Sequence, residues 1–310
     1  MKDQDDKSIN IQPSLNQDNV HSFSHFAMAT VYEIMISHKD SIYAEQAAQA
    51  AFEEIDRLEL ELSRFIENSD IARINAMSKN EEIIIGPDAL ECLVKCFEIK
   101  VETNGAFDIS IGSNIDLWKN KSTVQKTDPA LLKKVELQID IENFRVTLLS
   151  ENANLDLGGF GKGYAIDRVH ELLLDWGIES GFIHGGSSSA LAFGSSSKNE
   201  CREISFTHPE NKSVLYKAGL TNMALSGSGI SKENHIINPG TMEPVQERLA
   251  AWVFAETAAA SDALSTAFMI MPGNEINKYC EENKNVSAII LEKEQTNPKY
   301  IGEYFKQKDL

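Results

Sequence analysis

The spacing of apolar side chains predicts a long helix near the start of the chain. Residues 44–62 (AEQAAQAAFEEIDRLELEL) carry apolar residues at three- and four-residue intervals, which is the periodicity of one face of an α-helix. We therefore expect an amphipathic helix there. The run before it, 24–37, is rich in β-branched and aromatic residues and has no Pro or Gly, which favours a strand or a bent pair of strands.

Capping residues mark the next helices. Ser69 is typical of the cap of a short helix, and Pro87 is typical of the first turn of another that runs to about Val101. Later patterns predict helices at about 164–176, 258–271 and 274–282.

Strand-like segments lie between and after these helices. They cover 144–149, 201–206, 213–225, 249–255, 286–292 and 299–305. The Gly- and Ser-rich segment 181–194 indicates a close approach of backbone. Because strands and helices come in blocks rather than in strict alternation, we expect an α+β fold and not a doubly wound parallel sheet. We expect one large domain, 23–310, after a flexible lead-in, 1–22, which lacks apolar periodicity.

Composition narrows the classes of protein. The chain has 310 residues, 42% of them hydrophobic, which is enough for a sizeable core. Its 29 Lys and Arg against 47 Asp and Glu give a formal charge of −18, which argues against a nucleic-acid binder. The four cysteines have no zinc-type spacing and are too sparse for a disulfide scaffold, so a reducing compartment is expected.

The N-terminal segment bears on localisation. It is acidic and polar, without the basic and apolar regions of a secretory signal, and no later stretch has the length of a membrane span. The sequence as written predicts a soluble, cytoplasmic protein without a membrane span. An exported form stays open if a signal has been removed.

A glycine cluster, GGFGKG at 158–163, precedes a predicted helix. It is neither a dinucleotide fingerprint, because Tyr164 stands where Gly or Ala is needed, nor a P-loop, because Gly163 follows the Gly-Lys pair. Glycines before a helix still let backbone N–H groups approach an anion, and Lys162 adds a donor. Asp156 comes at the end of the preceding strand. The alternative is a tight turn without a ligand.

Two other groups carry candidate chemistry. Asp262, Ser265 and Thr266 share one face of a predicted apolar helix, and their oxygens would suit Mg²⁺; alternatively, the hydroxyls bond back to helix carbonyls. His235 precedes an Asn-Pro-Gly turn. Its unperturbed pKa near 6.5 makes it the readiest proton acceptor of this segment at neutral pH, although a structural histidine is the alternative.

Taken together, these segments resemble the FAD:protein FMN transferase family, the ApbE-like flavin transferases. The matching blocks are AMATVYEI (27–34), LSRFIENSDIARIN (62–75), NGAFDISIG (104–112), DLGGFGKGYAID (156–167), FIHGGSSSALAFG (182–194), HIINPGTMEPV (235–245) and ASDALSTAFMIM (260–271). The match spans roughly 25–292 and implies the single-domain, T-fold-related architecture of that family. Asn238 stands where the family usually has Asp, and Gly240, Thr241 and Met242 replace Arg-Thr-Gly.

The resemblance also implies a ligand set. FAD contacts would come from Met28, Phe65, Ala106, Phe107, Asp108, Asp156, Lys162 and Ile237. Mg²⁺ would be held by the Gly159 carbonyl with Asp262, Ser265 and Thr266. Catalytic roles would fall to His235 as the base, to Lys162 and to Asp262.

The function implied is Mg²⁺-dependent transfer of the FMN half of FAD to a Thr or Ser hydroxyl of a target protein, with release of AMP. The expected partner is an acceptor such as a redox-complex subunit or a flavin-dependent reductase. The alternatives are an FAD pyrophosphatase, in which water replaces the acceptor, and a flavin-binding protein without turnover, motivated by Asn238 and Met242.

Overall fold

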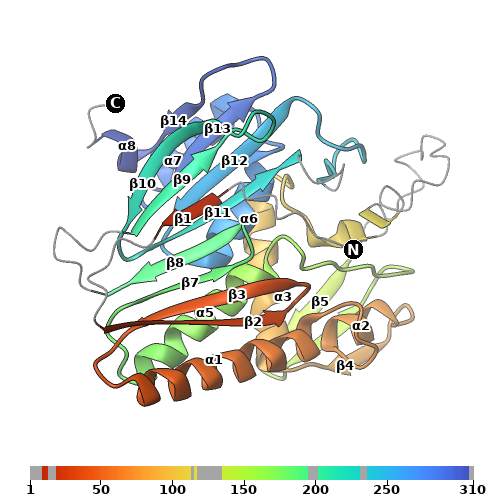
Figure 1. Ribbon diagram of the computed structural model, residues 1–310. Helices are drawn as coiled ribbons and strands as arrows, with labels where there is room; N and C mark the ends of the chain where they lie inside the picture. Colours follow the sequence, from red (N-terminus) through yellow and green to blue (C-terminus); the bar gives the residue numbers. More distant parts are fainter. Residues whose placement is uncertain are drawn as a thin grey trace, which may run out of the picture.

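The computed structural model describes residues 9–12, 19–112, 115–116, 135–194, 202–230 and 236–306 (Figure 1). The strands are β1 (Ile9–Gln12), β2 (Val20–Ala27), β3 (Thr30–Ser37), β4 (Glu82–Ile84), β5 (Leu137–Asp140), β6 (Arg145–Leu148), β7 (Gly181–Gly185), β8 (Ser189–Phe193), β9 (Arg202–Thr207), β10 (Val214–Leu220), β11 (Met223–Gly229), β12 (Arg248–Ala255), β13 (Ser287–Glu292) and β14 (Lys299–Ile301). The helices are α1 (Ser41–Leu62), α2 (Asp70–Asn75), α3 (Pro87–Glu102), α5 (Gly161–Asp175), α6 (Ala258–Phe268), α7 (Gly273–Glu282) and α8 (Glu303–Lys306).

One large antiparallel sheet organises the fold. Within the described ranges it has eight strands in the order β14-β13-β12-β11-β8-β7-β3-β2. Two smaller antiparallel sheets, β1-β9-β10 and β4-β6-β5, complete the strand pairing. Most neighbouring strands of the large sheet are consecutive along the chain, but β3 pairs with β7 and β8 pairs with β11, so the sheet also joins segments that are distant in sequence.

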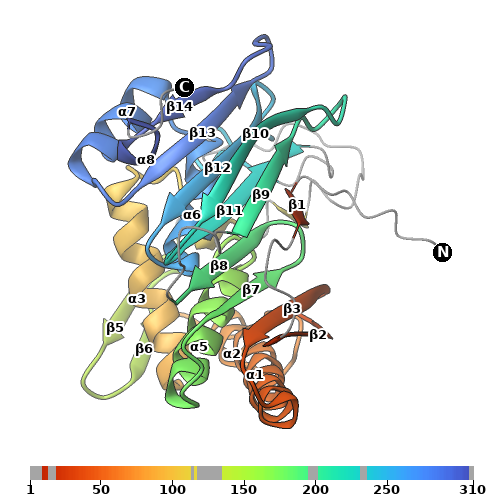
Figure 2. The same ribbon diagram turned by 60° about the vertical axis from the view of Figure 1, so that its left-hand side comes forward.

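Helices cover one face of the large sheet. α1, α5 and α6 lie against it, and α3 packs behind α1 and α6 (Figures 1 and 2). The apolar face that predicts α1 is the face that it buries, through side chains such as Ala47, Ile55 and Leu58. Asp40 begins the helix, since its side chain accepts from the backbone N–H groups of Ile42 and Tyr43.

A second core lies on the opposite face of the sheet. There β9, β10 and α8 close over the middle strands (Figure 2). The ring centroid of Phe206 lies 5.7 Å from that of Trp252 and 5.8 Å from that of Phe254, and all three side chains are buried. The large sheet is therefore covered on both faces, in three layers, as an α+β fold.

The structure confirms several sequence predictions at the level of single residues. The run 24–37 is the bent pair β2 and β3, which turns at Met28 and Ala29, both at positive φ. Ser69 caps α2 by accepting from Ala72 N–H, and Pro87 opens α3.

Other boundaries differ from the predictions. The run 213–225 is two strands in different sheets, β10 and β11, because the chain reverses at Asn222, which has a φ of 46°. The predicted strand 299–305 ends at Ile301, since Gly302 adopts a φ of 100° and α8 follows. α6 ends at Phe268, three residues before the predicted end.

The N-terminal part of the chain also has structure. β1 pairs with β9 inside the predicted lead-in 1–22, and β2 begins at Val20.

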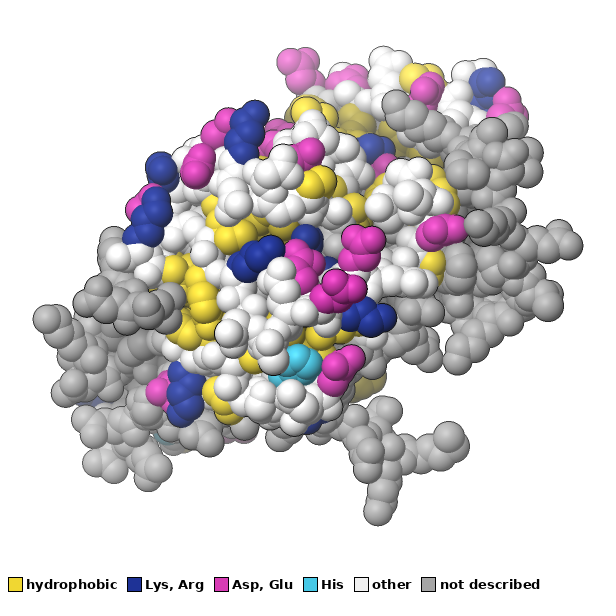
Figure 3. Space-filling view, turned by 90° about the horizontal axis from the view of Figure 1, so that it is seen from above, with side chains coloured by type: hydrophobic (Ala, Val, Ile, Leu, Met, Phe, Trp, Pro, Cys, Tyr) yellow, Lys and Arg dark blue, Asp and Glu magenta, His cyan; other side chains and the backbone are white. Residues whose placement is uncertain are grey.

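Two further expectations concern a basic surface for nucleic acid and membrane-spanning helices. In the face shown in Figure 3, Lys and Arg side chains are scattered among Asp and Glu over the described part of the surface, without a continuous basic area. None of the described helices combines the length and the apolar character that crossing a bilayer requires.

Candidate active site

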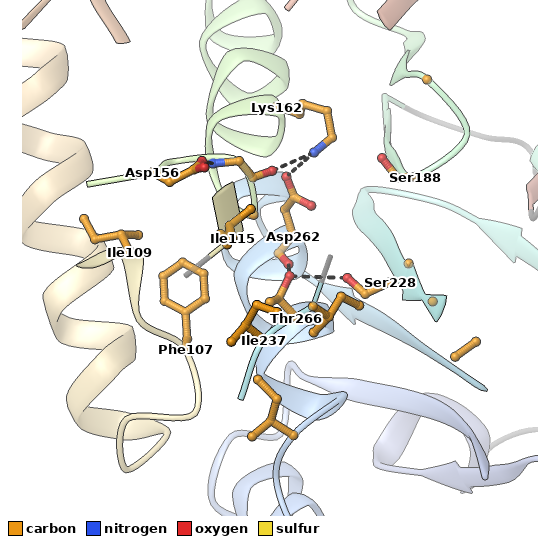
Figure 4. A pocket seen from close by; sticks show the side chains of 18 of the residues that line it. Phe107, Ile109, Ile115, Asp156, Lys162, Ser188, Ser228, Ile237, Asp262 and Thr266 are labelled. Carbon is orange, nitrogen blue, oxygen red and sulfur yellow. Dashed lines mark hydrogen bonds and ion pairs between the residues drawn. The ribbon is translucent and has the colours of Figure 1, made fainter. Parts of the chain in front are cut away.

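A cavity of about 390 Å³ lies beside the first turn of α5 and along one side of α6. β11, β12, the β2–β3 turn and residues 106–111 form its other walls (Figure 4). Most of the predicted site residues line it, namely Met28, Ala106, Phe107, Asp108, Asp156, Gly159, Lys162, Ile237, Asp262 and Thr266. The fold thus brings together blocks that are spread over most of the sequence.

Asp156 holds the turn that leads into α5. Its Oδ1 accepts from the backbone N–H of Gly158 at 2.7 Å, and its Oδ2 lies 2.9 Å from Nε of Arg64. The Arg64 side chain is 8% exposed and also pairs with Asp116, whose carboxylate raises the pKa of the guanidinium above its usual value. The turn that presents Gly159 is therefore fixed by a partly buried ion-pair network.

Lys162 points into the cavity. Its Nζ donates to the carbonyl of Gly158 at 3.1 Å and lies 3.4 Å from Oδ2 of Asp262 (Figure 4). The side chain is 24% exposed, so it is not a freely solvated surface lysine. Since Lys162 also sits in the first turn of α5, the positive end of the helix and the ammonium face the same space. This part of the cavity favours a negatively charged group.

Two contacts hold α5 against α6. A Cβ on Gly163 would lie 2.2 Å from the carbonyl oxygen of Ala258, so only glycine permits this approach. Both carboxylate oxygens of Asp167 accept from the first N–H groups of α6, those of Ala258 and Ala259, at 2.7 and 2.8 Å. Burial raises the pKa of Asp167 to about 6. These contacts set the distance between Lys162 and the oxygens of α6.

The α6 oxygens form the next part of the site. Asp262 is 3% exposed and accepts from Gly163 N–H at 3.3 Å. Ser265 Oγ donates to the carbonyl of Asp262 at 2.8 Å, and Thr266 Oγ1 lies 3.4 Å from the same carbonyl. The back-bonding that the sequence left open is therefore present. Thr266 nevertheless faces the cavity, and a Cβ on Gly159 would lie 3.0 Å from its Oγ1.

These groups fit a magnesium ion by the chemistry of their donors. Among the described residues no cluster of three His, Cys, Asp or Glu side chains exists that would hold a transition metal. A single buried carboxylate, a hydroxyl and the nearby Gly159 backbone are all hard oxygen donors, and Mg²⁺ is commonly held by one or two carboxylates together with substrate phosphate and water. Lys162 alongside would share the charge of that phosphate.

The wall opposite α6 comes from the segment after α3. Phe107 is 3% exposed and packs close to Gly159, where a Cβ would lie 3.6 Å from its ring. Asp108 pairs with Lys100 at 2.6 Å, and its other oxygen accepts from the backbone N–H and the hydroxyl of Ser110. Asp108 is thus held in place by neighbours while it lines the cavity.

The β2–β3 turn closes another side. The Tyr32 hydroxyl donates to Sδ of Met28 at 3.2 Å, and burial raises the pKa of Tyr32 above its ordinary value, so the phenol stays a donor. Gly186 packs against the same turn, because a Cβ there would lie 2.4 Å from Thr30 Oγ1. This contact is the close backbone approach expected of the Gly- and Ser-rich segment.

Three predicted residues stand apart from the lining. The Phe65 ring is 78% exposed and does not line the cavity, although the Arg64 guanidinium stacks 4.5 Å from its centroid. Ser265 is fully buried behind the cavity wall. His235 lies outside the described residues, although Ile236 and Ile237 beside it line the cavity.

Two residues of the site, Arg64 and Ser228, were not predicted from the sequence. Arg64 directly precedes Phe65 in a matching block, and only its burial shows that it anchors Asp156. Ser228 lines the cavity from β11, and its only sequence signal is a small residue between two glycines.

A second cavity of about 890 Å³ adjoins the first and shares Ala106, Asp108, Ile111 and Ile270 with it. Asn238, Gly240 and Met242 line this second cavity. Asn238 Oδ1 accepts from Gly240 N–H at 2.8 Å, a turn that an Asp side chain would make equally well. The turn is therefore preserved although Asn238 replaces the Asp that is usual in the family.

The chain matches the model of the ApbE family over residues 28–290. It belongs to the ApbE family. It is 24% identical to the FAD:protein FMN transferase of Haemophilus influenzae, over 92% of this chain and 90% of that protein. It is also 24% identical to the FAD:protein FMN transferase of Vibrio cholerae, over 90% of each chain.

Solved ApbE structures share the fold. The ApbE protein of Thermotoga maritima superimposes with a TM-score of 0.82 at 24% identity, over 94% of this chain and 99% of that one. The flavin transferase ApbE of Vibrio cholerae gives a TM-score of 0.82 at 19% identity, over 93% and 98%. The α+β fold and the ApbE-like architecture predicted from the sequence are confirmed.

Proposed function

We propose that this ApbE-family protein transfers the FMN half of FAD to a Thr or Ser hydroxyl of a target protein, in a Mg²⁺-dependent reaction that releases AMP. The observation that carries the proposal is the meeting of Lys162, Asp262 and Thr266 with the Gly158–Gly159 turn in one cavity. An anion-attracting helix end and a hard-oxygen face stand side by side there, which suits a pyrophosphate with its metal ion.

The reaction exchanges one phosphorus–oxygen bond for another. The acceptor hydroxyl oxygen bonds to the FMN phosphorus, the bond from that phosphorus to the bridging oxygen breaks, and AMP leaves with the bridging oxygen. The hydroxyl proton passes to a base, for which His235 is the candidate. Bound Mg²⁺ would supply charge stabilisation at the phosphate oxygens.

The remaining work falls to the protein's own side chains. Lys162 places an ammonium beside the phosphate on which charge develops, so its interaction gains strength in the transition state. Asp262, with Thr266 and the Gly159 carbonyl, is the proposed metal-binding group, and Ser265 supports it from behind the cavity wall. The remaining cavity residues, Met28, Ala106, Phe107, Asp108, Asp156 and Ile237, and Phe65 outside it, would bind and orient FAD.

The test follows both products. The protein is incubated with FAD, Mg²⁺ and a purified candidate acceptor domain, AMP is measured by chromatography, and the FMN adduct is measured by the mass of the acceptor. We expect AMP and adduct in equal amounts. AMP without adduct, at the same rate with and without acceptor, would support an FAD pyrophosphatase instead, and no AMP at all would support a flavin-binding protein without turnover.

Asp262→Ala tests the metal assignment directly. Because Asp262 is the only carboxylate of the proposed metal group, we expect the variant to lose metal-dependent AMP release while FAD binding weakens less. Asp175→Asn, an exposed position at the far end of α5, is the matched control and should behave like the wild type. Undiminished AMP release by Asp262→Ala in Mg²⁺ would refute the assignment.

A further inference from the structure

Ser228 lies on β11, where this strand packs against α6, and its hydroxyl reaches the α6 hydroxyls. Its Oγ lies 2.8 Å from Ser265 Oγ and 3.3 Å from Thr266 Oγ1. Figure 4 shows it approaching Thr266 from β11. Ser228 lines the cavity, whereas Ser265, at 0% exposure, does not.

The carbonyl of Asp262 determines the direction of these hydrogen bonds. A carbonyl only accepts, so Ser265 must donate its single proton to the carbonyl of Asp262. Ser265 can then only accept from Ser228, and the single proton of Ser228 is used in that bond. The Ser228 oxygen therefore keeps only lone pairs for other interactions. Of the two serines, Ser228 is the one that lines the cavity.

This arrangement selects the class of ligand. A hydroxyl whose proton is already donated cannot hydrogen-bond to a phosphate oxygen, which is itself an acceptor. It can, however, coordinate a hard cation, for which hydroxyl oxygens are suitable ligands. Ser228 is therefore suited to the metal ion and not to the phosphate.

We propose that Ser228 supplies a cavity-facing oxygen of the cation site together with Asp262 and Thr266, and that Ser265 is a positioning residue that orients Ser228 from behind. The inference rests on the proposed metal-dependent function. It changes the expected ligand set, because the serine that was predicted on α6 acts through a serine on β11.

The strand geometry supports a fixed position for Ser228. The residues on either side of it are glycines, and a Cβ on Gly227 would lie 2.5 Å from Trp252 Cδ1, so the indole packs directly against the strand. In register, Ser228 pairs with Ala251 of β12. Ser226, two residues earlier and on the same face of the strand, is fully buried, and its hydroxyl has no hydrogen-bond partner among the described residues.

Ser226 therefore offers a matched control. The full-length protein is titrated with Mn²⁺, a cation with similar ligand preferences to Mg²⁺, and free Mn²⁺ is followed by its electron paramagnetic resonance signal. We expect Ser228→Ala to weaken Mn²⁺ binding by at least about 10- to 100-fold, which is what losing even an outer-shell partner of a metal ligand typically costs. Ser226→Ala should stay within about twofold of the wild type, since it removes an unpartnered hydroxyl.

A second variant remains informative if alanine destabilises the strand. Ser228→Cys replaces a hard ligand atom by a soft one of similar reach, so binding should shift from Mn²⁺ toward Cd²⁺. The measurement is the concentration of Cd²⁺ that displaces Mn²⁺, compared between variant and wild type. A purely structural serine would not change this preference.

Asp262→Asn separates failure of the inference from failure of the proposed function. If Asp262→Asn loses Mn²⁺ binding while Ser228→Ala matches Ser226→Ala and Ser228→Cys keeps the wild-type metal preference, the role of Ser228 is overturned and the metal site stands. If Asp262→Asn binds Mn²⁺ like the wild type, the metal site itself is overturned, and the role of Ser228 with it.

Discussion

Two glycines in the first turn of α5, two residues apart, should respond in opposite directions to the same substitution. At Gly163 an added Cβ would lie 2.2 Å from the carbonyl oxygen of Ala258 and 2.7 Å from the backbone nitrogen of Ala259. These are backbone atoms at the start of α6 and cannot rotate away. At Gly161 the nearest atom would be Leu157 Cβ at 3.8 Å, an ordinary contact.

The expected magnitudes follow from this difference. Overpacking of this kind costs about 1–3 kcal/mol, and the severe overlap at Gly163 places Gly163→Ala near the upper end. Alanine recovers up to about 1 kcal/mol of helix propensity, so the net loss should be about 2 kcal/mol. Gly161→Ala has no overlap to offset that gain, so it should be neutral or stabilising by about 0.5 kcal/mol.

The same substitution should also disturb the site. To reach an ordinary contact, α5 and α6 must separate by about 1 Å, which displaces Lys162 from Asp262 and the α6 oxygens. A misplacement of about 1 Å costs about 100-fold in rate in well-organised active sites. We therefore expect Gly163→Ala to lose AMP release about 100-fold while Gly161→Ala keeps it.

Thermal unfolding and AMP release together check this reasoning. For a chain of 310 residues, 2 kcal/mol corresponds to a fall in the unfolding temperature of about 3 °C. Both variants are measured in the same buffer with FAD and Mg²⁺. Equal unfolding temperatures and equal rates in the two variants would refute the packing argument, because it predicts that only one of them disturbs the α5–α6 contact.

Three further predictions concern charge and protons. Lys162→Ala should lower the rate of AMP release more than FAD affinity, since its ammonium acts mainly on charge that develops in the transition state; an unchanged rate at saturating FAD would remove Lys162 from the mechanism. Because burial raises the pKa of Asp167 to about 6 in the folded state, protonation of this carboxyl favours folding. Its contribution to the free energy of unfolding is full below the unfolded pKa, near 4, and is lost as pH rises through about 6. The unfolding temperature of the wild type relative to Asp167→Asn should therefore fall across that window, and a difference that rises with pH would contradict this. His235→Gln should lose single-turnover FMN transfer while binding FAD, and wild-type transfer should fall with decreasing pH near 6.5; a variant with the wild-type rate and pH profile would exclude His235 as the base.

The elements that the sequence predicted well are those whose signals are local. The apolar stripe of α1 and the helix starts at Ser69 and Pro87 depend only on residues within a turn or two. They can therefore be predicted without knowledge of the tertiary structure. The matching blocks also predicted ten of the residues that line the cavity, from Met28 to Thr266. The order of those blocks along the chain carried the resemblance to the ApbE family, which the match to the family model over residues 28–290 then showed.

Local sequence patterns did not predict the features that depend on contacts between segments distant in sequence. The run 213–225 is mostly apolar on both sides of Thr221 and Asn222, with Lys217 as the exception, and the packing of β10 over the second core and of β11 in the large sheet separates its two strands. In the same way, helix periodicity placed Asp262, Ser265 and Thr266 on one face. It had no information on which of their oxygens reaches the cavity.

The composition of the site was therefore determined by tertiary structure. Lys162 and Asp262 meet although 100 residues separate them, because Gly163 admits the backbone of α6 and Asp167 caps that helix. Ser228 enters the site because antiparallel pairing of β11 between β8 and β12 sets it opposite α6. Sequence periodicity specifies which face of an element is apolar, whereas the neighbour that each face meets is fixed only when the sheet and helices pack into one core.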